Sequence, residues 1–256
     1  MTPRVEVRSL HKSFPTEGGT IEVLDGIDLV VDKRQFVTLL GPSGCGKSTM
    51  FDIVAGLEDP TSGEVLIDGD SRERAGRCGY MPQKDLLMPW KTVGDNVAVG
   101  KVAKGVPRQQ ARSEALEVLS RFGLAEFAGL YPRLLSGGMR QRAALARTYL
   151  AGNDLLLLDE PFGSLDSLTR LRMQSWLLDV WRQTDSAVLF VTHDIDEAIR
   201  LGDRVYVLTE RPASVALILD VDLPRPRPYE TVLSPQFARL KAVALEHLHL
   251  GAVGDG

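Results

Sequence analysis

The segment that most constrains the fold of this 256-residue chain is a glycine-rich stretch that matches the pattern G-x-x-x-x-G-K-[ST]. An apolar run typical of a strand, residues 36–40, precedes it, and a helix is predicted from residue 47 onward. Its glycines permit backbone dihedral angles that other residues avoid, so its N–H groups can turn inward into an anion-binding nest at a helix N-terminus. The stretch therefore predicts a phosphate-binding loop. It consists of Gly41, Pro42, Ser43, Gly44, Cys45, Gly46, Lys47, Ser48 and Thr49.

Two side chains of this loop and two acidic residues further along predict the chemistry of the site. Lys47 supplies a positive charge for the β and γ phosphates of a nucleotide, and Ser48 offers a hydroxyl to Mg²⁺. The apolar run at residues 155–158 ends in Asp159 and Glu160. We expect Asp159 to hold Mg²⁺ and Glu160 to orient or deprotonate the attacking water.

The alternation of apolar strand-like runs with helical patterns predicts an α/β core that is split by a helical insert. The continuous apolar run at 155–158 suits a strand buried on both faces, as in a parallel sheet. Strands are predicted at residues 5–10, 21–31, 36–40, 63–68, 155–159, 187–192, 204–209 and 215–221, and helices at 107–119, 141–150, 167–182, 194–201 and 234–249. The core would take about residues 1–84 and 151–222, the insert about 85–150, and a tail with a closing helix about 223–256. Residues 224–228 alternate proline and arginine and are interpreted as an exposed, extended connector.

Composition excludes several classes of protein. Lys and Arg number 30 against 34 Asp and Glu, a net charge of −4, so no overall cationic field exists to hold a nucleic acid or an anionic membrane. The two cysteines, Cys45 and Cys78, suit a reducing cytosol, and Cys45 is interpreted as a small neutral loop residue, with redox sensing as the alternative. No apolar run approaches the ~20 residues of a membrane-spanning helix. A membrane role would therefore require a partner.

The run Leu135-Ser136-Gly137-Gly138-Met139-Arg140-Gln141-Arg142 resembles the signature motif of the ATP-binding cassette (ABC) ATPases. Ser136 and the amides of Gly137 and Gly138 open a helix and form a second anion site, although the same residues could serve only as a helix cap. In the family this motif faces the γ-phosphate bound by the other protomer. The resemblance therefore implies a homodimer that sandwiches two ATP molecules. It also implies a P-loop NTPase (RecA-like) core with a mainly parallel sheet, an N-terminal antiparallel β-subdomain and an inserted α-helical subdomain.

Further residues match family motifs in the expected order. Gln83 matches the Q-loop glutamine, which contacts Mg²⁺ and links to the transmembrane partner. Asp166 matches the D-loop, which crosses the dimer interface, and His193 matches the switch histidine, which contacts the γ-phosphate. Phe14 stands at the position of the adenine-stacking aromatic; the alternative is a core aromatic. The resemblance thus implies that Lys47, Gln83, Glu160 and His193 carry catalysis.

Within the family, residues 85–93 and the tail at 222–227 resemble the ATPases of nitrate, sulfonate, taurine and thiamine-precursor importers. This implies a peripheral subunit on the cytoplasmic face of the cell membrane, bound to integral membrane permease subunits and served indirectly by a solute-binding protein. We expect the permease contact near residues 83–90. The apolar residues Leu86, Leu87, Pro89 and Trp90 would help to form its groove, with core packing as the alternative for Trp90.

Three other functions stay open at this point. The ATPase subunit of an exporter or lipid-extraction complex shares the family motifs, although residues 85–93 argue against it. A soluble ATPase acting on nucleic acid or ribosomes would call for a basic stripe, which the net charge does not support. A non-catalytic regulator would not need Lys47, Asp159, Glu160 and His193 together. The segment Tyr80–Gln83 departs from common nitrate and sulfonate members and leaves the thiamine-precursor type open.

Overall fold

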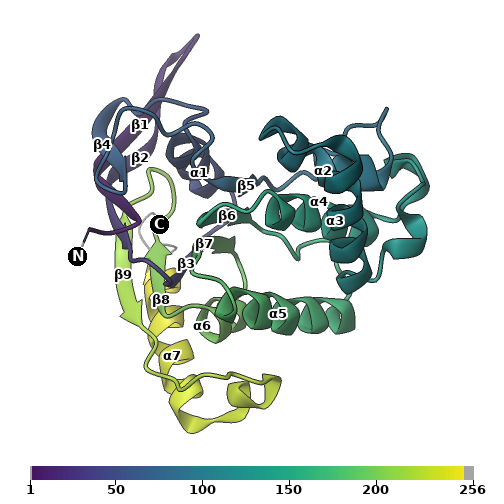
Figure 1. Cartoon of the computed structure of the whole chain (residues 1–256). Coiled ribbons are helices and arrows are strands. Elements are labelled where there is room, and N and C mark those ends of the chain that lie inside the picture. The colour runs from purple at the N-terminus through teal and green to yellow at the C-terminus, as the bar shows by residue number, and fades with distance from the viewer. Residues whose placement is uncertain (1, 251–256) are drawn as a thin grey trace.

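The computed structural model describes residues 2–250, so the last part of the predicted tail, residues 251–256, lies outside the described residues. Two sheets form the core (Figure 1). The smaller is antiparallel, in the order β2-β1-β4, and the larger runs β5-β6-β7-β3-β8-β9 with only β9 antiparallel to its neighbour. The strands are β1 (Val5–Thr16), β2 (Gly19–Val31), β3 (Phe36–Leu40), β4 (Ser62–Ile67), β5 (Gly79–Met81), β6 (Leu155–Asp159), β7 (Ala187–Thr192), β8 (Arg204–Leu208) and β9 (Val215–Asp220).

The central strands bring the predicted site residues to one edge of the large sheet. Every residue of β3, β6 and β7 is buried, because helices or the small sheet cover both faces. Leu40 of β3 pairs with Thr192 of β7, and Asp159 of β6 pairs with Val191 of β7. The three parallel strands therefore end at the same level, and the residues that follow them meet there.

Helices cover this sheet and form a separate group on one side of it (Figure 1). The helices α2, α3 and α4 pack on one another and share an apolar core with α5 and one face of the large sheet. No helix within residues 2–250 has the length and apolar character needed to cross a membrane. The helices are α1 (Lys47–Ala55), α2 (Val93–Ala103), α3 (Arg108–Arg121), α4 (Gly137–Leu150), α5 (Ser167–Arg182), α6 (Ile195–Leu201) and α7 (Pro235–Leu250).

Helix α2 was not predicted from the sequence, and tertiary contacts explain why it forms. Its two glycines lower its intrinsic helix propensity. Thr92 caps it by accepting a hydrogen bond from the Asp95 amide at 3.2 Å. A Cβ at Gly94 would lie 3.2 Å from the carbonyl oxygen of Ala128, to which the Gly94 amide donates. The close approach of another segment thus favours glycine at this position despite the helix.

The interpretation of residues 224–228 as an exposed connector is wrong for its two arginines. The prolines are exposed, but Arg227 is only 4% exposed and donates to the carbonyl oxygens of Ile199, Gly202 and Val221. Arg225 pairs with Asp203 at 2.6 Å. The carbonyls at the end of α6 lack partners within their own helix, and the Arg227 guanidinium supplies them. Through its two arginines, the segment therefore anchors the C-terminal tail to the core.

Candidate nucleotide-binding site

A cavity of about 200 Å³ lies where β3 and β6 end, at the N-terminus of α1. It brings together the glycine-rich loop, the acidic pair at the end of β6 and Gln83, the glutamine that matches the Q-loop. The residues that line it are Ser43, Gly44, Gly46, Lys47, Ser48, Thr49, Gln83, Asp159, Glu160 and Arg211.

The glycine-rich loop adopts the conformation that its sequence requires. Gly44 and Gly46 have φ values of 78° and 125°, in the region that favours glycine. A Cβ at Gly46 would also lie 2.9 Å from side-chain atoms of Val23 and Leu24 on β2. Lys47 is only 5% exposed, and its ammonium donates to loop carbonyls, at 2.8 Å in the case of Gly41. The loop thus presents backbone amides and one buried cation at the start of a helix.

Asp159 ends β6 beneath this loop and is 2% exposed. Among residues 2–250 its Oδ2 atom has no hydrogen-bond partner. Burial raises the pKa of Asp159, and a hydrogen bond from Ser48 acts in the opposite direction. An unpartnered buried carboxylate oxygen next to a hydroxyl fits a hard cation such as Mg²⁺, which prefers oxygen ligands.

Glu160 is held by residues from three other segments. Its Oε1 lies 3.3 Å from Nδ1 of His193, and its Oε2 accepts a hydrogen bond from Nε2 of Gln83 at 3.4 Å. Its carbonyl oxygen accepts from Gln141 of α4 at 3.3 Å. Its backbone is in the left-handed region, with φ of 46°, which costs energy for a residue with a Cβ. The carboxylate therefore has a specific orientation at the edge of the cavity.

Three groups of candidate residues lie apart from this cavity. Ser136 caps α4 by accepting from the Met139 amide at 3.3 Å, and Gly137 lines another cavity with Gln83. Asp166 caps α5 by accepting from the Thr169 amide at 3.0 Å. Phe14 is half-buried, and the Lys12 ammonium lies 4.6 Å from the centre of its ring. Within one chain, the signature motif therefore does not reach the chain's own phosphate loop.

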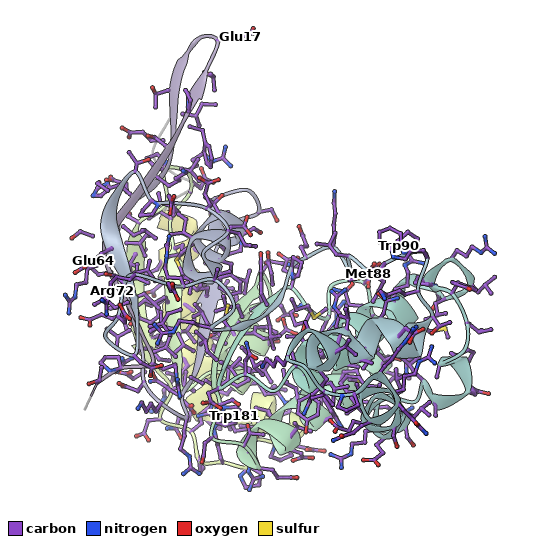
Figure 2. All side chains as sticks on the ribbon, turned by 45° about the horizontal axis from the view of Figure 1, so that its top comes forward. Glu17, Glu64, Arg72, Met88, Trp90 and Trp181 are labelled. Atoms are coloured by element: carbon purple, nitrogen blue, oxygen red, sulfur yellow. The ribbon has the colours of Figure 1, made fainter. Side chains whose placement is uncertain are left out.

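The apolar cluster after Gln83 is divided between core and surface. Leu87 is 7% exposed and belongs to the core, so its predicted place in a surface groove is wrong. Leu86 is 60% exposed and Trp90 is 74% exposed. Figure 2 shows Trp90 at the outer edge of the helical group, next to Met88. Core packing, the alternative for Trp90, is therefore wrong as well.

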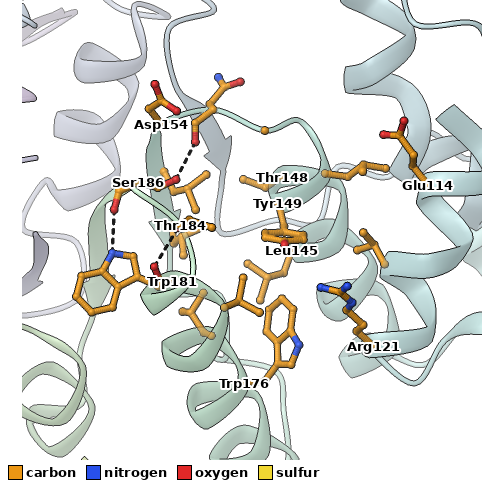
Figure 3. A pocket seen from close by; sticks show the side chains of 18 of the residues that line it. Glu114, Arg121, Leu145, Thr148, Tyr149, Asp154, Trp176, Trp181, Thr184 and Ser186 are labelled. Atoms are coloured by element: carbon orange, nitrogen blue, oxygen red, sulfur yellow. Dashed lines mark hydrogen bonds between the residues drawn. The ribbon is translucent and has the colours of Figure 1, made fainter. Parts of the chain in front are cut away.

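A larger cavity, of about 430 Å³, contains none of the candidate residues. It lies between the helical group and α5, with Tyr149 and Trp176 among its aromatic walls and Arg121 at its rim (Figure 3). Cavity size alone therefore does not identify the site in this molecule. The smaller cavity is the one that combines a cation, backbone amides and an unpartnered carboxylate oxygen.

Arg211 is a residue of the smaller cavity that the sequence did not indicate. It follows β8, and its guanidinium donates to the carbonyl oxygen of Gly44 in the loop. The only sequence signal was its place after a strand whose end lies at the same edge of the sheet. Many arginines follow strands, so this signal does not single out one residue.

This fold and site define a class of proteins. The phosphate loop follows β3, the acidic pair lies at the end of β6, and β7 lies between these two strands in a mainly parallel sheet. That arrangement is the one expected of a P-loop NTPase with a RecA-like core. The antiparallel sheet and the helical group add the two parts that the ABC ATPases were expected to have.

Comparison with known proteins supports the assignment to the ABC ATPases. The family model described as "ABC transporter" matches residues 24–163. The chain belongs to the ABC transporter family and is an ATP-binding, ATP-hydrolysing protein of that family, as the signature motif predicted. It resembles the dimeric structure of MJ0796, a bacterial ABC transporter cassette, with a TM-score of 0.79 and 30% identity over 86% of this chain and all of that one. A post-hydrolysis dimer of MJ0796 bound to ADP and phosphate matches equally well. The predicted fold class is therefore confirmed.

Relatives of similar length include proteins named for import. The taurine import ATP-binding protein TauB of Rhizobium johnstonii is 45% identical over 91% of each chain. The aliphatic sulfonates import ATP-binding protein SsuB 1 of Agrobacterium fabrum is 45% identical over 94% of this chain and 82% of its own. An uncharacterized ABC transporter ATP-binding protein of Methanocaldococcus jannaschii, MJ0412, is 44% identical over 89% and 85%. The departure at Tyr80–Gln83 therefore does not separate this chain from taurine and sulfonate relatives.

Proposed function

We propose that this chain hydrolyses ATP as the cytoplasmic subunit of an importer for taurine or a related aliphatic sulfonate. The observation that carries the enzymatic part is the position of the Glu160 carboxylate, between Gln83 and His193 at the mouth of the phosphate-loop cavity. The likeness to TauB and SsuB supports import and the solute class.

The residues divide the chemistry among them. The loop amides and Lys47 bind the phosphates of ATP. Asp159, Ser48 and Gln83 would hold Mg²⁺, which neutralises phosphate charge when bound. No group of three or more His, Cys, Asp and Glu side chains in residues 2–250 could hold a metal ion. Phe14 would stack on the adenine.

Glu160 acts as the general base of hydrolysis. Its carboxylate accepts a proton from the water that attacks the γ-phosphorus, as the bond from that phosphorus to the bridging oxygen breaks and ADP leaves. His193 orients this carboxylate and contacts the γ-phosphate. Gln83 donates a hydrogen bond to the other carboxylate oxygen, so the Glu160 carboxylate is contacted by two other segments of the chain. Phosphate and ADP are the products.

A second copy of the chain completes each site. Ser136, Gly137 and Gly138 lie outside the chain's own cavity, at the start of α4, where they would form a second anion site. In a dimer they would face the γ-phosphate bound by the partner copy, with Asp166 crossing the interface. Such contacts exist only in the closed dimer, so ATP favours closure and hydrolysis releases it.

The permease would bind the surface after Gln83. Leu86 and Trp90 are large apolar residues that this surface leaves exposed, and Pro89 is exposed beside them. Asp85, in the same segment, pairs at 3.0 Å with Arg140 of α4, which belongs to the run that resembles the signature motif. This contact would connect the permease surface to the part of the chain that faces the partner copy's ATP.

An affinity experiment tests the proposal. A tagged Glu160→Gln protein is recovered from detergent-solubilised membranes with MgATP, and its partners are identified by mass spectrometry. A Lys47→Ala protein, impaired in ATP binding, is the control. Recovery of a multi-span permease, with a solute-binding protein, is the expected result. Recovery of soluble or nucleic-acid-associated partners alone would contradict the transport function and leave the ATPase chemistry in place.

A further inference from the structure

Arg211 lies at the phosphate loop but belongs to none of the motifs that the sequence singled out. Its guanidinium donates to the carbonyl oxygen of Gly44, and the residue lines the same cavity as Lys47 and Glu160. Arginine carries five N–H donors, and this contact uses one of its two terminal nitrogens. Among residues 2–250, no other acceptor and no carboxylate ion pair engages the guanidinium. Donors therefore remain for a ligand in the cavity.

The loop that carries Arg211 is fixed on both sides. The Thr209 hydroxyl accepts a hydrogen bond from the Ser214 amide at 2.8 Å, which closes the loop between β8 and β9. Ala213 is fully buried, and its amide and carbonyl bond to Val23 and Asp25 of β2, each at 2.9 Å. The backbone of Arg211 is therefore held at the cavity by neighbours on both strands and on β2.

The same part of β2 supports the phosphate loop. Val23 and Leu24 are the residues that a Cβ at Gly46 would meet at 2.9 Å. The phosphate loop and the loop of Arg211 thus rest on one short stretch of β2. This shared support fixes the position of the Arg211 loop relative to the phosphate loop. Because both loops are already ordered, ligand binding costs less conformational entropy than it would if the Arg211 loop were unsupported.

The charges that line the cavity also favour a role in phosphate binding. Lys47 and Arg211 are its cations, and Asp159 and Glu160 are its acids. Without Arg211 the lining would carry one formal positive charge against two negative ones. A nucleoside triphosphate is strongly anionic, so a second fixed cation offsets the repulsion from the acidic pair. Arginine suits this task because its planar donors match phosphate oxygens.

We propose that Arg211 is a phosphate-contacting residue of the nucleotide site, which it reaches from the loop after β8 while it braces Gly44. This inference rests on the proposed function, since it requires ATP at the phosphate loop. The guanidinium would add charge-assisted hydrogen bonds to the phosphates and keep the Gly44 carbonyl turned away from them. Removing it should weaken nucleotide binding without preventing folding, because the loop keeps its backbone contacts to β2.

Binding measurements on purified protein test this role. The wild type, Arg211→Ala, Arg211→Lys and Arg72→Ala are titrated calorimetrically with a non-hydrolysable ATP analogue and Mg²⁺. Arg72 is the matched control, because its side chain is 87% exposed and pairs with Asp70 beside the small sheet (Figure 2). We expect the dissociation constant of Arg211→Ala to rise roughly tenfold, that of Arg211→Lys to rise less, and that of Arg72→Ala to stay unchanged.

Thermal unfolding distinguishes a phosphate-contacting Arg211 from an Arg211 that only stabilises the loop through Gly44. With a phosphate contact, Arg211→Ala keeps the nucleotide-free melting temperature and loses part of the increase that the analogue causes. The proposal is overturned if the dissociation constant of Arg211→Ala equals that of the wild type. It is also overturned if the variant loses only nucleotide-free stability, as a purely structural brace would. If the wild type itself fails to bind the analogue, the proposed function fails with it, so the two failures are distinguishable.

Discussion

The Nδ1 atom of His193 lies 3.3 Å from Oε1 of Glu160, although the two residues follow different strands. They meet because β6 and β7 are adjacent and parallel and end at the same level. The other oxygen of the same carboxylate accepts from Gln83, which follows β5. The carboxylate that follows β6 is thus contacted by residues that follow the strands on either side of it, β5 and β7, and the proposed base is oriented from two sides.

Replacing Glu160 by glutamine should stop ATP hydrolysis and keep ATP binding. The amide has nearly the same shape but cannot accept the proton of the attacking water, so kcat should fall by about 10²- to 10⁴-fold. Steady-state ATPase assays and a binding titration measure the two quantities. The exposed Glu126→Gln serves as the control for charge. Turnover at the wild-type rate in Glu160→Gln would refute the assignment of the base.

Replacing His193 by alanine should lower kcat with a smaller effect on nucleotide affinity. The variant leaves Oε1 of Glu160 without its neighbour, so the carboxylate can turn away from the attacking water. We expect a loss of about 10- to 100-fold, smaller than that of Glu160→Gln, because the base itself remains. The control is His247→Ala on α7, remote from the cavity lining. An unchanged kcat in His193→Ala would remove this residue from the mechanism.

Replacing Trp90 by alanine should abolish permease binding and leave the permease-free ATPase intact. The side chain is 74% exposed, so its loss creates no internal cavity, and the melting temperature should change little. Co-purification with the permease and an ATPase assay measure the two effects. Leu233→Ala, at a residue that is 80% exposed outside the helical group, is the control. Misfolding of Trp90→Ala, or normal permease binding, would contradict the docking role.

Replacing Asp95 by asparagine should destabilise the helical group in a pH-dependent way. Arg112 of α3 donates to both carboxylate oxygens at 2.6 Å and holds the pKa of Asp95 at about 2. The folded state thus favours the ionised form, so this stabilisation is present above the ordinary pKa of 3.8 and is lost as the pH falls towards about 2.

We expect Asp95→Asn to lower the free energy of unfolding by about 1 kcal/mol at pH 7, measured by urea denaturation. The difference from the wild type should shrink as the pH falls through this range. Asp185→Asn is the control, because its ion pair with Arg34 is solvent-exposed, with an Asp185 side chain that is 82% accessible. A difference that stays constant with pH would show that the Arg112 ion pair is not its cause.

Much of the fold could be predicted where local signals and tertiary structure agree. The bounds of β3, β6 and β7 match the expectations from the sequence, because these buried apolar runs end at a glycine or at polar residues. The bounds of α5 match as well. Strand β1 was expected to end at Leu10, but it continues to Thr16 because pairing with β2 supplies backbone partners for a polar stretch. Pairing of this kind is not visible in one segment alone.

In the candidate site, too, residues with a local sequence signal were predicted and residues whose role depends on tertiary contacts were not. Residues in contiguous motifs were found from their spacing, since the phosphate loop and the pair Asp159-Glu160 carry their own signals. Arg211 was missed because its role depends on which backbone lies opposite, here the loop carbonyl of Gly44. Outside the site, the role of Arg227 was missed for the same reason, since it depends on the carbonyls at the end of α6. No local pattern encodes these approaches, which arise only when the sheet is assembled.

The central claim is that two copies of this chain close on ATP, each completing the other's site. Light scattering on size-exclusion chromatography of Glu160→Gln measures it directly. With MgATP, the account predicts a species of twice the chain mass of 28.1 kDa, while MgADP or a further Ser136→Arg substitution at the signature motif should give the single-chain mass. The same mass with and without ATP, or an ATP-dependent dimer that persists after Ser136→Arg, would contradict the account.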